Sequence, residues 1–376
     1  MPVLPPLRRR HWPIVLPLLL VIGLAAGWSG FWLYAANKAQ ATLTQWRERE
    51  AKAGHVYSCG KQSLGGYPFR IELTCGDTEA KITDLDPPLS VRGTSLHVAS
   101  QVYDPTLLIA EIGGPVTVAV AGAPLLRADW TLAQVSARGT PAAPQRVSVA
   151  IDGAKLERRV DGADVNVVRA THIEAHARVA SQTSSGRPIL DFAIELDGMS
   201  APTLHPIAAQ PFDLTATATL HGLDNLQPLP IQTRLKQLQS AGGRLEITKA
   251  RVHQGDVTAV AAGTLSLTAE GRLNGELSMT AAGLDRVLPL LGIDQLTGEN
   301  GADGKVAAAL GKLDRVFPGL GQIARKHAGA GLAAGLALLG RPAQLEGQKA
   351  IALPLRFADG AVYLGPLRVG MVKPLF

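Results

Sequence analysis

The 376-residue chain is short of aromatic, charged and cysteine residues, and each shortage narrows what it can be. Aromatic residues make up 5% and charged residues 18%, whereas apolar residues reach 46%. A chain this apolar can bury a sizeable core, so disorder is not expected. With so few aromatic side chains, its small aliphatic residues suit thin β-sheets better than a deep aromatic pocket.

Concentrated basic charge is also missing after the N-terminus. The formal net charge is +6, but Arg8, Arg9 and Arg10 supply half of it ahead of a long apolar run. Without these three, 34 of the 37 basic residues remain against 31 acidic ones. Nucleic-acid binding normally needs a concentrated basic surface, so this near-balance predicts no nucleic-acid partner.

Sequence signatures of catalytic and cofactor sites are missing too. The nine histidines are scattered, without the His-Glu-x-x-His spacing of a catalytic metal site. No Gly-x-Ser-x-Gly elbow occurs, and Gly311-Lys312 lacks the flanking residues of a phosphate-binding loop. Asp294, Glu299 and Asp303 do not have calcium-loop spacing and are interpreted as a solvated loop. We therefore predict no enzyme, no metal and no cofactor.

One long uncharged run, residues 13–36, predicts a transmembrane anchor. At about 1.5 Å per residue it can span a hydrocarbon core of roughly 30 Å. Trp28, Trp32 and Tyr34 gather near its far end, where amphipathic rings favour the lipid–water boundary. The positive-inside rule keeps residues 1–12 in the cytoplasm. The predicted protein therefore crosses a membrane once, with its bulk outside the cytoplasm.

A cleaved signal peptide is the alternative to an anchor. Ala39-Gln40-Ala41 resembles a small-residue cleavage site, but the apolar run is longer than a typical signal core. The anchor is therefore favoured, with cleavage left open. Residues 37–54 are rich in helix formers and end at Gly54, which predicts a helical stalk that continues the anchor. Residues 55–376 then form the extracytoplasmic domain.

Cys59 and Cys75 are the only cysteines, and they flank a strong turn signal at residues 64–68. Residues 55–59 and 69–74 are predicted to be short strands, so a hairpin would bring the two sulfurs together. An oxidising exterior favours a disulfide there, worth roughly 3 kcal/mol. A metal site or a reactive thiol is less favoured, because no Cys-x-x-Cys and no suitable neighbouring ligands are present.

Apolar residues alternate with polar ones in segment after segment, which predicts a mainly β fold of extended, curved antiparallel sheet with one apolar face. The segments are 116–120, 126–132, 147–151, 173–179, 190–196 and 214–220. The polar stretch 181–188 is a loop or a boundary between two halves of the domain. The loop is favoured, because similar strands continue on both sides.

Residues 257–280 predict the clearest hairpin, with a turn near residues 269–271. A candidate hydrophobic groove lies on one of its faces and consists of Leu265, Leu267, Leu273, Leu277 and Met279. A second hairpin is predicted from strands at 351–358 and 361–369, joined by Asp359-Gly360.

Three late helices are predicted at residues 284–291, 305–317 and 320–339. The last is wholly apolar from residue 328 onward but too short to span a bilayer. It is predicted to be buried on the sheet; the alternative is a helix that covers a groove or dips into the membrane surface.

Gly66, Tyr67, Pro68, Phe69 and Arg70 lie between the two cysteines, and Tyr103-Asp104-Pro105 follows. With the N-terminal anchor, this pattern resembles an uncharacterised bacterial family, domain of unknown function 2125, over most of the chain. That resemblance implies a bacterial protein that crosses the inner membrane once, with its bulk in the periplasm, and it implies no particular activity.

The glycine and leucine rhythm of 257–280, with a similar stretch at 360–367, also resembles the repeat of AsmA-like envelope proteins. This resemblance implies curved sheets with an apolar inner face and a role in lipid transport or envelope homeostasis. The expected function is therefore binding of membrane lipid or another hydrophobic ligand. The alternative is a non-catalytic scaffold that assembles other envelope proteins at the inner membrane.

Overall fold

The computed structural model describes residues 12–140, 143–204, 206–227, 229–283, 340–365 and 367–376. Over these ranges the chain forms seventeen strands, two α-helices and one short 3-10 helix. It divides into two compact units, Met1–Gly113 with Val118–Ala123, and Gly114–Thr117 with Pro124–Phe376. The predicted mainly β, antiparallel fold with an N-terminal apolar helix is confirmed.

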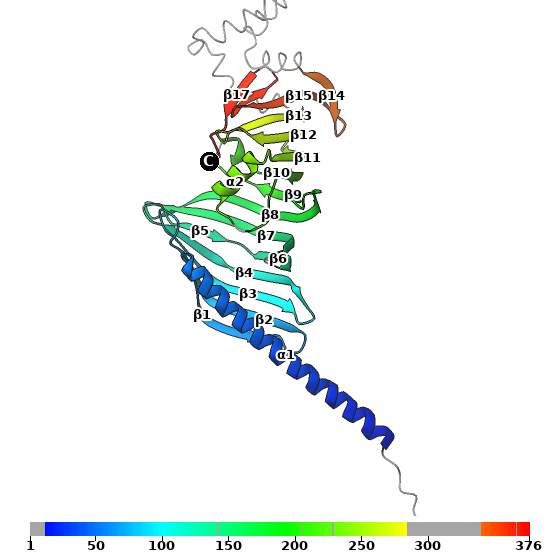
Figure 1. The fold of residues 1–376 in the computed structure, drawn as a ribbon. Helices are drawn as coiled ribbons and strands as arrows, with labels where there is room; N and C mark the ends of the chain where they lie inside the picture. Colours follow the sequence, from blue (N-terminus) through cyan, green and yellow to red (C-terminus); the bar gives the residue numbers. More distant parts are fainter. Residues whose placement is uncertain (1–11, 141–142, 205, 228, 284–339, 366) are drawn as a thin grey trace, which may run out of the picture. The chain divides into compact units, whose positions relative to one another are not determined.

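Helix α1 (Trp12–Lys52) combines the predicted anchor and stalk in one continuous element (Figure 1). It is long and apolar enough to cross a membrane. Gly54 ends it with φ +91°, a backbone conformation that glycine adopts readily, and the chain turns back into the first strand.

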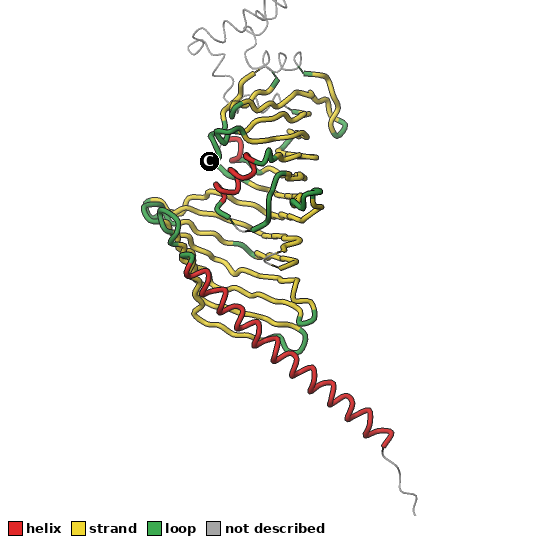
Figure 2. Tube along the Cα trace, viewed as in Figure 1, coloured by secondary structure: helices red, strands yellow, loops and turns green. Residues whose placement is uncertain are grey.

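The first unit contains an antiparallel meander. The second half of α1 lies in front of this meander in Figure 2. Its strands are β1 (His55–Gly65), β2 (Arg70–Ile82), β3 (Leu89–Gln101) and β4 (Asp104–Val120). The first two are longer than the predicted 55–59 and 69–74, because cross-strand pairing continues from Gly65↔Glu72 out to His55↔Ile82.

The second unit holds a larger antiparallel sheet. Its strands are β5 (Leu126–Asp129), β6 (Leu132–Thr140), β7 (Ala143–Val160), β8 (Ala163–Gln182), β9 (Pro188–Met199), β10 (Phe212–His221), β11 (Arg244–Gln254), β12 (Val257–Leu267), β13 (Leu273–Ala282), β14 (Arg341–Leu345), β15 (Gln348–Ala358), β16 (Ala361–Leu364) and β17 (Leu367–Met371). Neighbours from β6 to β13 pair in chain order. Strand β13 then pairs with β15, which also pairs with β14 and β16.

Two predicted strands of this unit are interrupted. The segment 126–132 breaks after Asp129, whose carboxylate accepts the backbone N–H of Trp130 at 2.9 Å. The segment 361–369 breaks at Gly365, where φ is +58° and the chain turns so that Leu364 pairs with Leu367, which makes β16 and β17 a further hairpin. The Asp359-Gly360 turn is present as predicted, with φ positive at both residues.

The other differences concern helices and the loop at 181–188. Helix α2 (Ile231–Ser240) and the 3-10 helix η1 (Pro206–Ala209) were not predicted. Residues 183–187 form the loop between the paired strands β8 and β9, whereas the two units divide near residues 113–124. The predicted helices 284–291, 305–317 and 320–339 lie outside the described residues, as do Asp294, Glu299 and Asp303.

Candidate functional site

The strand register of the second unit sorts its side chains onto two faces, and one of them is apolar. Residues directly opposite each other in an antiparallel pair lie on the same face. Ile194 on β9, for example, opposes Ala175 on β8 and Ala216 on β10.

Four rows of such pairs cross the sheet, and together they are called the apolar face below. The rows run through Ile151, Ile173, Leu196, Leu214, Val252, Ala259, Ala281 and Ile351; through Val149, Ala175, Ile194, Ala216, Ala250, Ala261, Met279 and Leu353; through Val147, Ala177, Phe192, Ala218, Ile247, Gly263, Leu277, Leu355 and Leu364; and through Val179, Leu190, Leu220, Leu245, Leu265, Gly275, Phe357 and Val362. Every position in these rows is an apolar residue or glycine.

The five predicted groove residues all lie on this face. Leu265, Leu277 and Met279 belong to the rows, and Leu267 opposes Leu273 where the hairpin closes. Leu277 is buried, and the other four side chains are half-buried. The hairpin of β12 and β13 therefore supplies part of a surface to which nine strands contribute.

The apolar face is covered unevenly. At the β15 and β16 end, Leu353 and Leu364 are only 2% and 6% exposed. The chain at Gly340 lies directly over Ile351 and Leu353, where an added Cβ would collide with both side chains. At the other end, Ile194 on β9 is 41% exposed and Val252 on β11 is 37% exposed. Among the described residues, the first end is an ordinary core and the second is an open aliphatic surface.

The opposite face of the same strands is a solvated network of ion pairs and hydrogen bonds. His172 on β8 contacts the Asp152 carboxylate at 2.6 Å, and His176 contacts Glu174 at 3.0 Å. The hydrogen bond to Asp152 raises the pKa of His172. A shallow depression of about 170 Å³ lies beside these groups, and Lys249 helps to line it. In the described part of the chain, no group of three or more His, Cys, Asp or Glu is placed to hold a metal ion.

On β11, Arg251 makes a two-pronged ion pair with Glu346 in the turn between β14 and β15, at 2.7 and 2.8 Å. The guanidinium lowers the pKa of the Glu346 carboxyl. Because the two residues are 95 positions apart, this pair fastens the C-terminal strands of the second unit to the middle of its sheet.

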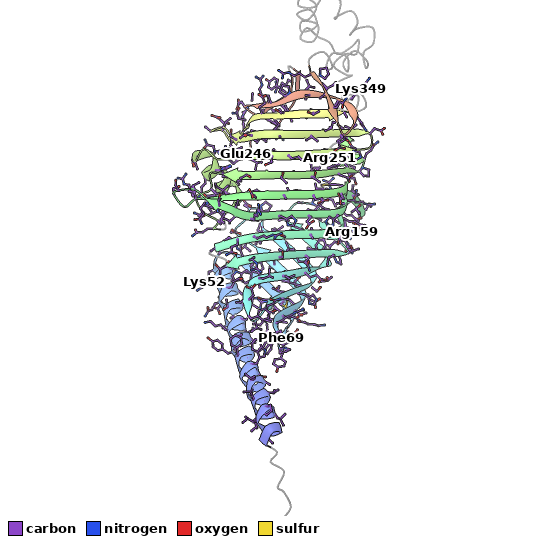
Figure 3. The ribbon with its side chains drawn as sticks, turned by 90° about the vertical axis from the view of Figure 1, so that its right-hand side faces the viewer. Lys52, Phe69, Arg159, Glu246, Arg251 and Lys349 are labelled. Carbon is purple, nitrogen blue, oxygen red and sulfur yellow. A yellow bond between two sulfur atoms is a disulfide. The ribbon has the colours of Figure 1, made fainter. Side chains whose placement is uncertain are left out.

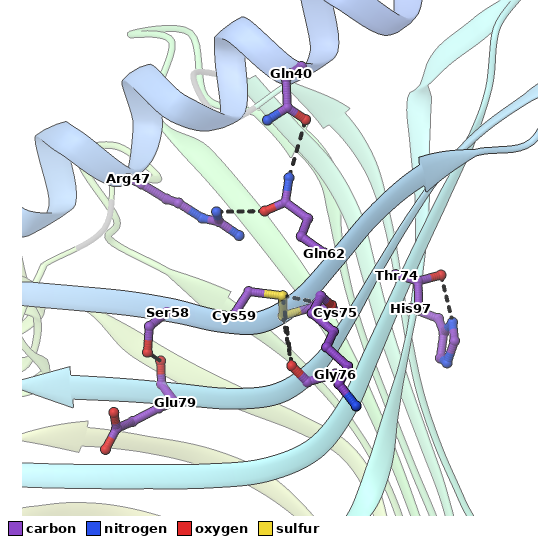
Figure 4. Close-up of a disulfide and its surroundings, with 11 residues drawn as sticks. Gln40, Arg47, Ser58, Cys59, Gln62, Thr74, Cys75, Gly76, Glu79 and His97 are labelled. Atoms are coloured by element: carbon purple, nitrogen blue, oxygen red, sulfur yellow. Dashed lines mark hydrogen bonds between the residues drawn. A yellow bond between two sulfur atoms is a disulfide. The ribbon is translucent and has the colours of Figure 1, made fainter.

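In the first unit, Cys59 and Cys75 form a disulfide, as predicted, with their Cα atoms 5.6 Å apart (Figure 4). The cysteines are not directly opposite, because Cys75 pairs with Gln62 in the ladder. Gly60 and Asp77 lie between them and interrupt the regular pairing, and Asp77 has φ +54°. This local irregularity brings the two offset cysteines within reach of each other.

The Gly66 to Arg70 motif forms the turn between β1 and β2 and contacts α1. The indole N–H of Trp28 donates to Pro68 O at 2.8 Å, and that of Trp32 donates to Arg70 O at 2.7 Å. Gly66 has φ +97°, and a Cβ there would lie 2.7 Å from Arg70 O, so the turn requires glycine. In Figure 3, Phe69 lies beside α1, well away from Lys52 at the C-terminal end of that helix.

Two aromatic pairs reinforce this docking. Trp32 meets Tyr67 edge-to-face with ring centroids 5.5 Å apart, and Trp28 meets Phe69 at 6.0 Å. Such pairs contribute about 0.5–1.5 kcal/mol beyond the area they bury. The Ser29 hydroxyl and the Tyr67 hydroxyl are also hydrogen-bonded at 2.8 Å.

Further along α1, the contacts with β1 are mostly polar. Gln62 accepts a hydrogen bond from Arg47 and donates one to Gln40, as Figure 4 shows. Closer to the helix end, the His55 ring contacts the carboxylates of Glu50 at 2.9 Å and Asp84 at 3.2 Å. The hydrogen bond to Glu50, followed by that to Asp84, raises the pKa of His55.

A family model described as "Uncharacterized protein conserved in bacteria (DUF2125)" matches residues 32–373. The chain belongs to this family. The match includes both cysteines and the turn motif, so the predicted family resemblance is confirmed. No curated protein and no solved structure matches the chain. The likeness to AsmA-like proteins stays a prediction.

Two features of this family member were missed in the sequence. The hydrogen bonds from Trp28 and Trp32 to the turn depend on packing between segments that are distant in the sequence, so no local sequence pattern predicts them. The His172, Glu174 and His176 network has a signal that was available, because three ionisable residues at period two alternate with Ile173, Ala175 and Ala177.

Proposed function

We propose that the protein is a periplasmic, inner-membrane-anchored lipid-binding protein, and that the open part of the apolar face receives acyl chains or another hydrophobic ligand. The observation that carries this proposal is the exposure of Ile194 and Val252 within rows of aliphatic side chains. Large exposed apolar patches usually mark interaction sites, because leaving them in water costs free energy.

The shape of the surface favours flexible aliphatic chains over flat aromatic ligands. Two of its four rows alternate alanine with larger residues, as in Ala175, Ile194 and Ala216, and the rows on either side consist of larger aliphatic residues in these strands. From β7 to β11, four strand spacings of about 4.8 Å give an open run of roughly 19 Å. A surface of that length with no charged side chain in its rows suits an extended acyl chain.

The contacts of α1 support a retained anchor over a cleaved signal peptide. Cleavage at Ala39-Gln40-Ala41 would remove Trp28 and Trp32, which donate to the carbonyls of the β1–β2 turn. The disulfide fits an oxidising compartment such as the periplasm. Arg8, Arg9 and Arg10 favour a cytoplasmic N-terminus, which directs the folded units to the periplasm.

The test is native mass spectrometry with lipid extraction on the full chain and two variants. Ile194→Asp places a charge on the open part of the apolar face. Thr215→Asp is the matched control, since Thr215 is an exposed residue of the neighbouring strand β10 that points to the polar face. We expect the wild type and Thr215→Asp to carry phospholipid at a defined stoichiometry, and Ile194→Asp to lose most of it.

Lipid that surrounds α1 cannot mimic this result, because both variants keep the same helix. Equal lipid content in the two variants would overturn the proposal. A stable protein partner recovered without bound lipid would favour the alternative function, a scaffold that assembles other envelope proteins at the inner membrane. Val252→Asp changes another exposed residue of the apolar face. If it also loses lipid, the loss in Ile194→Asp is not caused by a folding defect of that one variant.

A further inference from the structure

Helix α1 changes its surroundings at Trp28. From Val15 to Gly27 every side chain is exposed, and the side chains that pack begin at Trp28 and Ser29. Beyond them, buried or half-buried positions recur at Trp32, Ala36 and Leu43, which is helical spacing for one face laid on a sheet. The folded part of the first unit therefore begins against the helix at Trp28.

The predicted outer boundary of the membrane lies within about one helical turn of Trp28. A helix rises about 1.5 Å per residue, so the twenty steps from Trp12 to Trp32 cover about 30 Å, the thickness of a hydrocarbon core. Tryptophan favours both boundaries of a bilayer, and the three arginines precede Trp12. If α1 spans the membrane, its outer boundary lies at the level of Trp28 and Trp32.

The β1–β2 turn, which touches those two residues, carries exposed aromatic side chains. Tyr67 is 56% exposed and Phe69 is 59% exposed. The β3–β4 turn adjoins them, because Val102 donates its N–H to Phe69 O at 3.0 Å, and it presents Tyr103 at 64% exposure. Three large rings in water at one end of a small sheet are unfavourable, whereas the lipid–water boundary is where such rings are stabilised.

The backbone of the turn is also prepared for a weakly hydrated environment. The carbonyls of Pro68 and Arg70 accept the indole N–H groups, and Gly66 O accepts the N–H of Arg70 at 2.8 Å. Backbone groups near the hydrocarbon need such internal partners, because water is scarce there. The exposed Arg70 guanidinium contacts the Glu72 carboxylate at 3.5 Å. Its remaining N–H groups, on a long stem, can reach lipid phosphates while the rings lie deeper.

We propose that the β1–β2 turn, Gly66–Arg70, and Tyr103 form a second membrane contact that rests in the outer headgroup–acyl boundary of the bilayer beside α1. The occupant of this surface is the phospholipid bilayer that α1 crosses. The proposal rests on the anchoring part of the proposed function and is independent of ligand binding on the apolar face of the second unit.

The test measures the depth of single labelled positions in the full chain. Phe69→Cys and Tyr103→Cys are each labelled with an environment-sensitive fluorophore without reductant, so that the Cys59–Cys75 disulfide stays closed. The proteins are placed in nanodiscs of phosphatidylethanolamine and phosphatidylglycerol with spin-labelled quencher lipids. Asp86→Cys is the matched control, because it lies in the exposed β2–β3 loop. Thr83 ties that loop to Gly54 at the far end of α1.

We expect the fluorophores at positions 69 and 103 to lose most of their emission in nanodiscs whose lipids carry the quencher near the headgroup. The fluorophore at position 86 should lose almost none. Leu20→Cys, inside the apolar run, reports whether α1 itself is inserted. Quenching at 20 without quenching at 69 and 103 would overturn the membrane contact while leaving the anchor intact. Absence of quenching at 20 would overturn the anchor, and the membrane contact with it.

Discussion

Trp32 donates its indole N–H to the carbonyl oxygen of Arg70 at 2.7 Å, across 38 residues of sequence. The bond joins the apolar helix to the turn that carries the motif of the family. It makes the motif understandable in physical terms: Gly66 permits the turn, Tyr67 and Phe69 pack on the indoles, and the carbonyl groups receive the N–H donors.

Replacing Trp32 with Phe should loosen this turn. The variant keeps an aromatic ring beside Tyr67 but removes the N–H donor, which should cost about 0.5–1.5 kcal/mol of local stability. Hydrogen exchange of the amides at 66–70 should accelerate in nanodiscs. Tyr34→Phe is the control, because Tyr34 is 68% exposed and should leave that exchange unchanged. Unchanged exchange in Trp32→Phe would show that the hydrogen bond does not hold the turn.

Removing the disulfide should destabilise the first unit. A double Cys59→Ser, Cys75→Ser variant opens a loop with a sequence separation of 16. Loop-closure entropy predicts a loss of about 3 kcal/mol in the free energy of unfolding. The loss is measured by urea unfolding, in which protease cleavage within the first unit reports the unfolded fraction. Reductant should lower the urea midpoint of the wild type to that of the double variant, and it should not change the midpoint of the double variant itself. A midpoint of the double variant that changes with reductant would contradict the prediction.

Gly263→Ala should destabilise the second unit. Gly263 lies opposite Leu277 with φ +152°, and a Cβ there would collide with the backbone of Glu276 and Leu277. A side chain held in such a conformation costs about 1–3 kcal/mol. Gly370→Ala is the matched control, because an added Cβ there meets no atom within 4 Å. Equal urea midpoints for the two variants would mean that β12 and β13 can separate to admit the methyl group.

The His172–Asp152 contact should make stability depend on pH. The pKa of His172 is raised above its ordinary value of about 6.5, mainly by the hydrogen bond to Asp152. The contact therefore stabilises the fold fully below pH 6.5, and this contribution is lost as pH rises through the raised pKa. His172→Gln should lower the free energy of unfolding at acidic pH by no more than about 1 kcal/mol, since both groups are partly exposed.

Urea unfolding of wild type and His172→Gln, below pH 6.5 and well above the raised pKa, tests this. Asp152→Asn should remove most of the same pH-dependent increment, because Asp152 is the main partner of His172 and Glu174, at 3.7 Å from the ring, contributes less. A larger loss for His172→Gln at alkaline pH would give the wrong sign and refute the assignment.

Much of the sheet was readable from sequence, because alternation with a period of two survives in every strand that has one apolar face. Strands β8, β9, β10, β12 and β13 all contain the predicted segments. The breaks at Trp130 and Gly365 were not readable from alternation, which carries no signal for the Asp129 side chain that accepts the Trp130 N–H or for the positive φ of Gly365. Helix α2 was missed because it is short, polar and without a buried residue.

The candidate site was predicted only in part. Alternation placed Leu265 and Leu277 on one face, but it cannot say how far that face is covered. Burial separates the two ends, with Leu353 enclosed and Ile194 open, and it depends on contacts such as that of Gly340 with Ile351. Those contacts follow from tertiary packing, so the positions now chosen for testing differ from the ones that the hairpin alone suggested.

The reversal at Gly54 also sets an order of assembly. Strand β1 runs back along the helix that precedes it, and contacts pair Glu50 with His55, Trp46 with Tyr57 and Trp28 with Phe69. The widest of these contacts closes a loop of about 40 residues, and local contacts form faster than distant ones. A nascent chain synthesised only as far as β2 therefore already contains every partner of the helix–turn junction. The first strands can be fastened to α1 before the second unit has been synthesised.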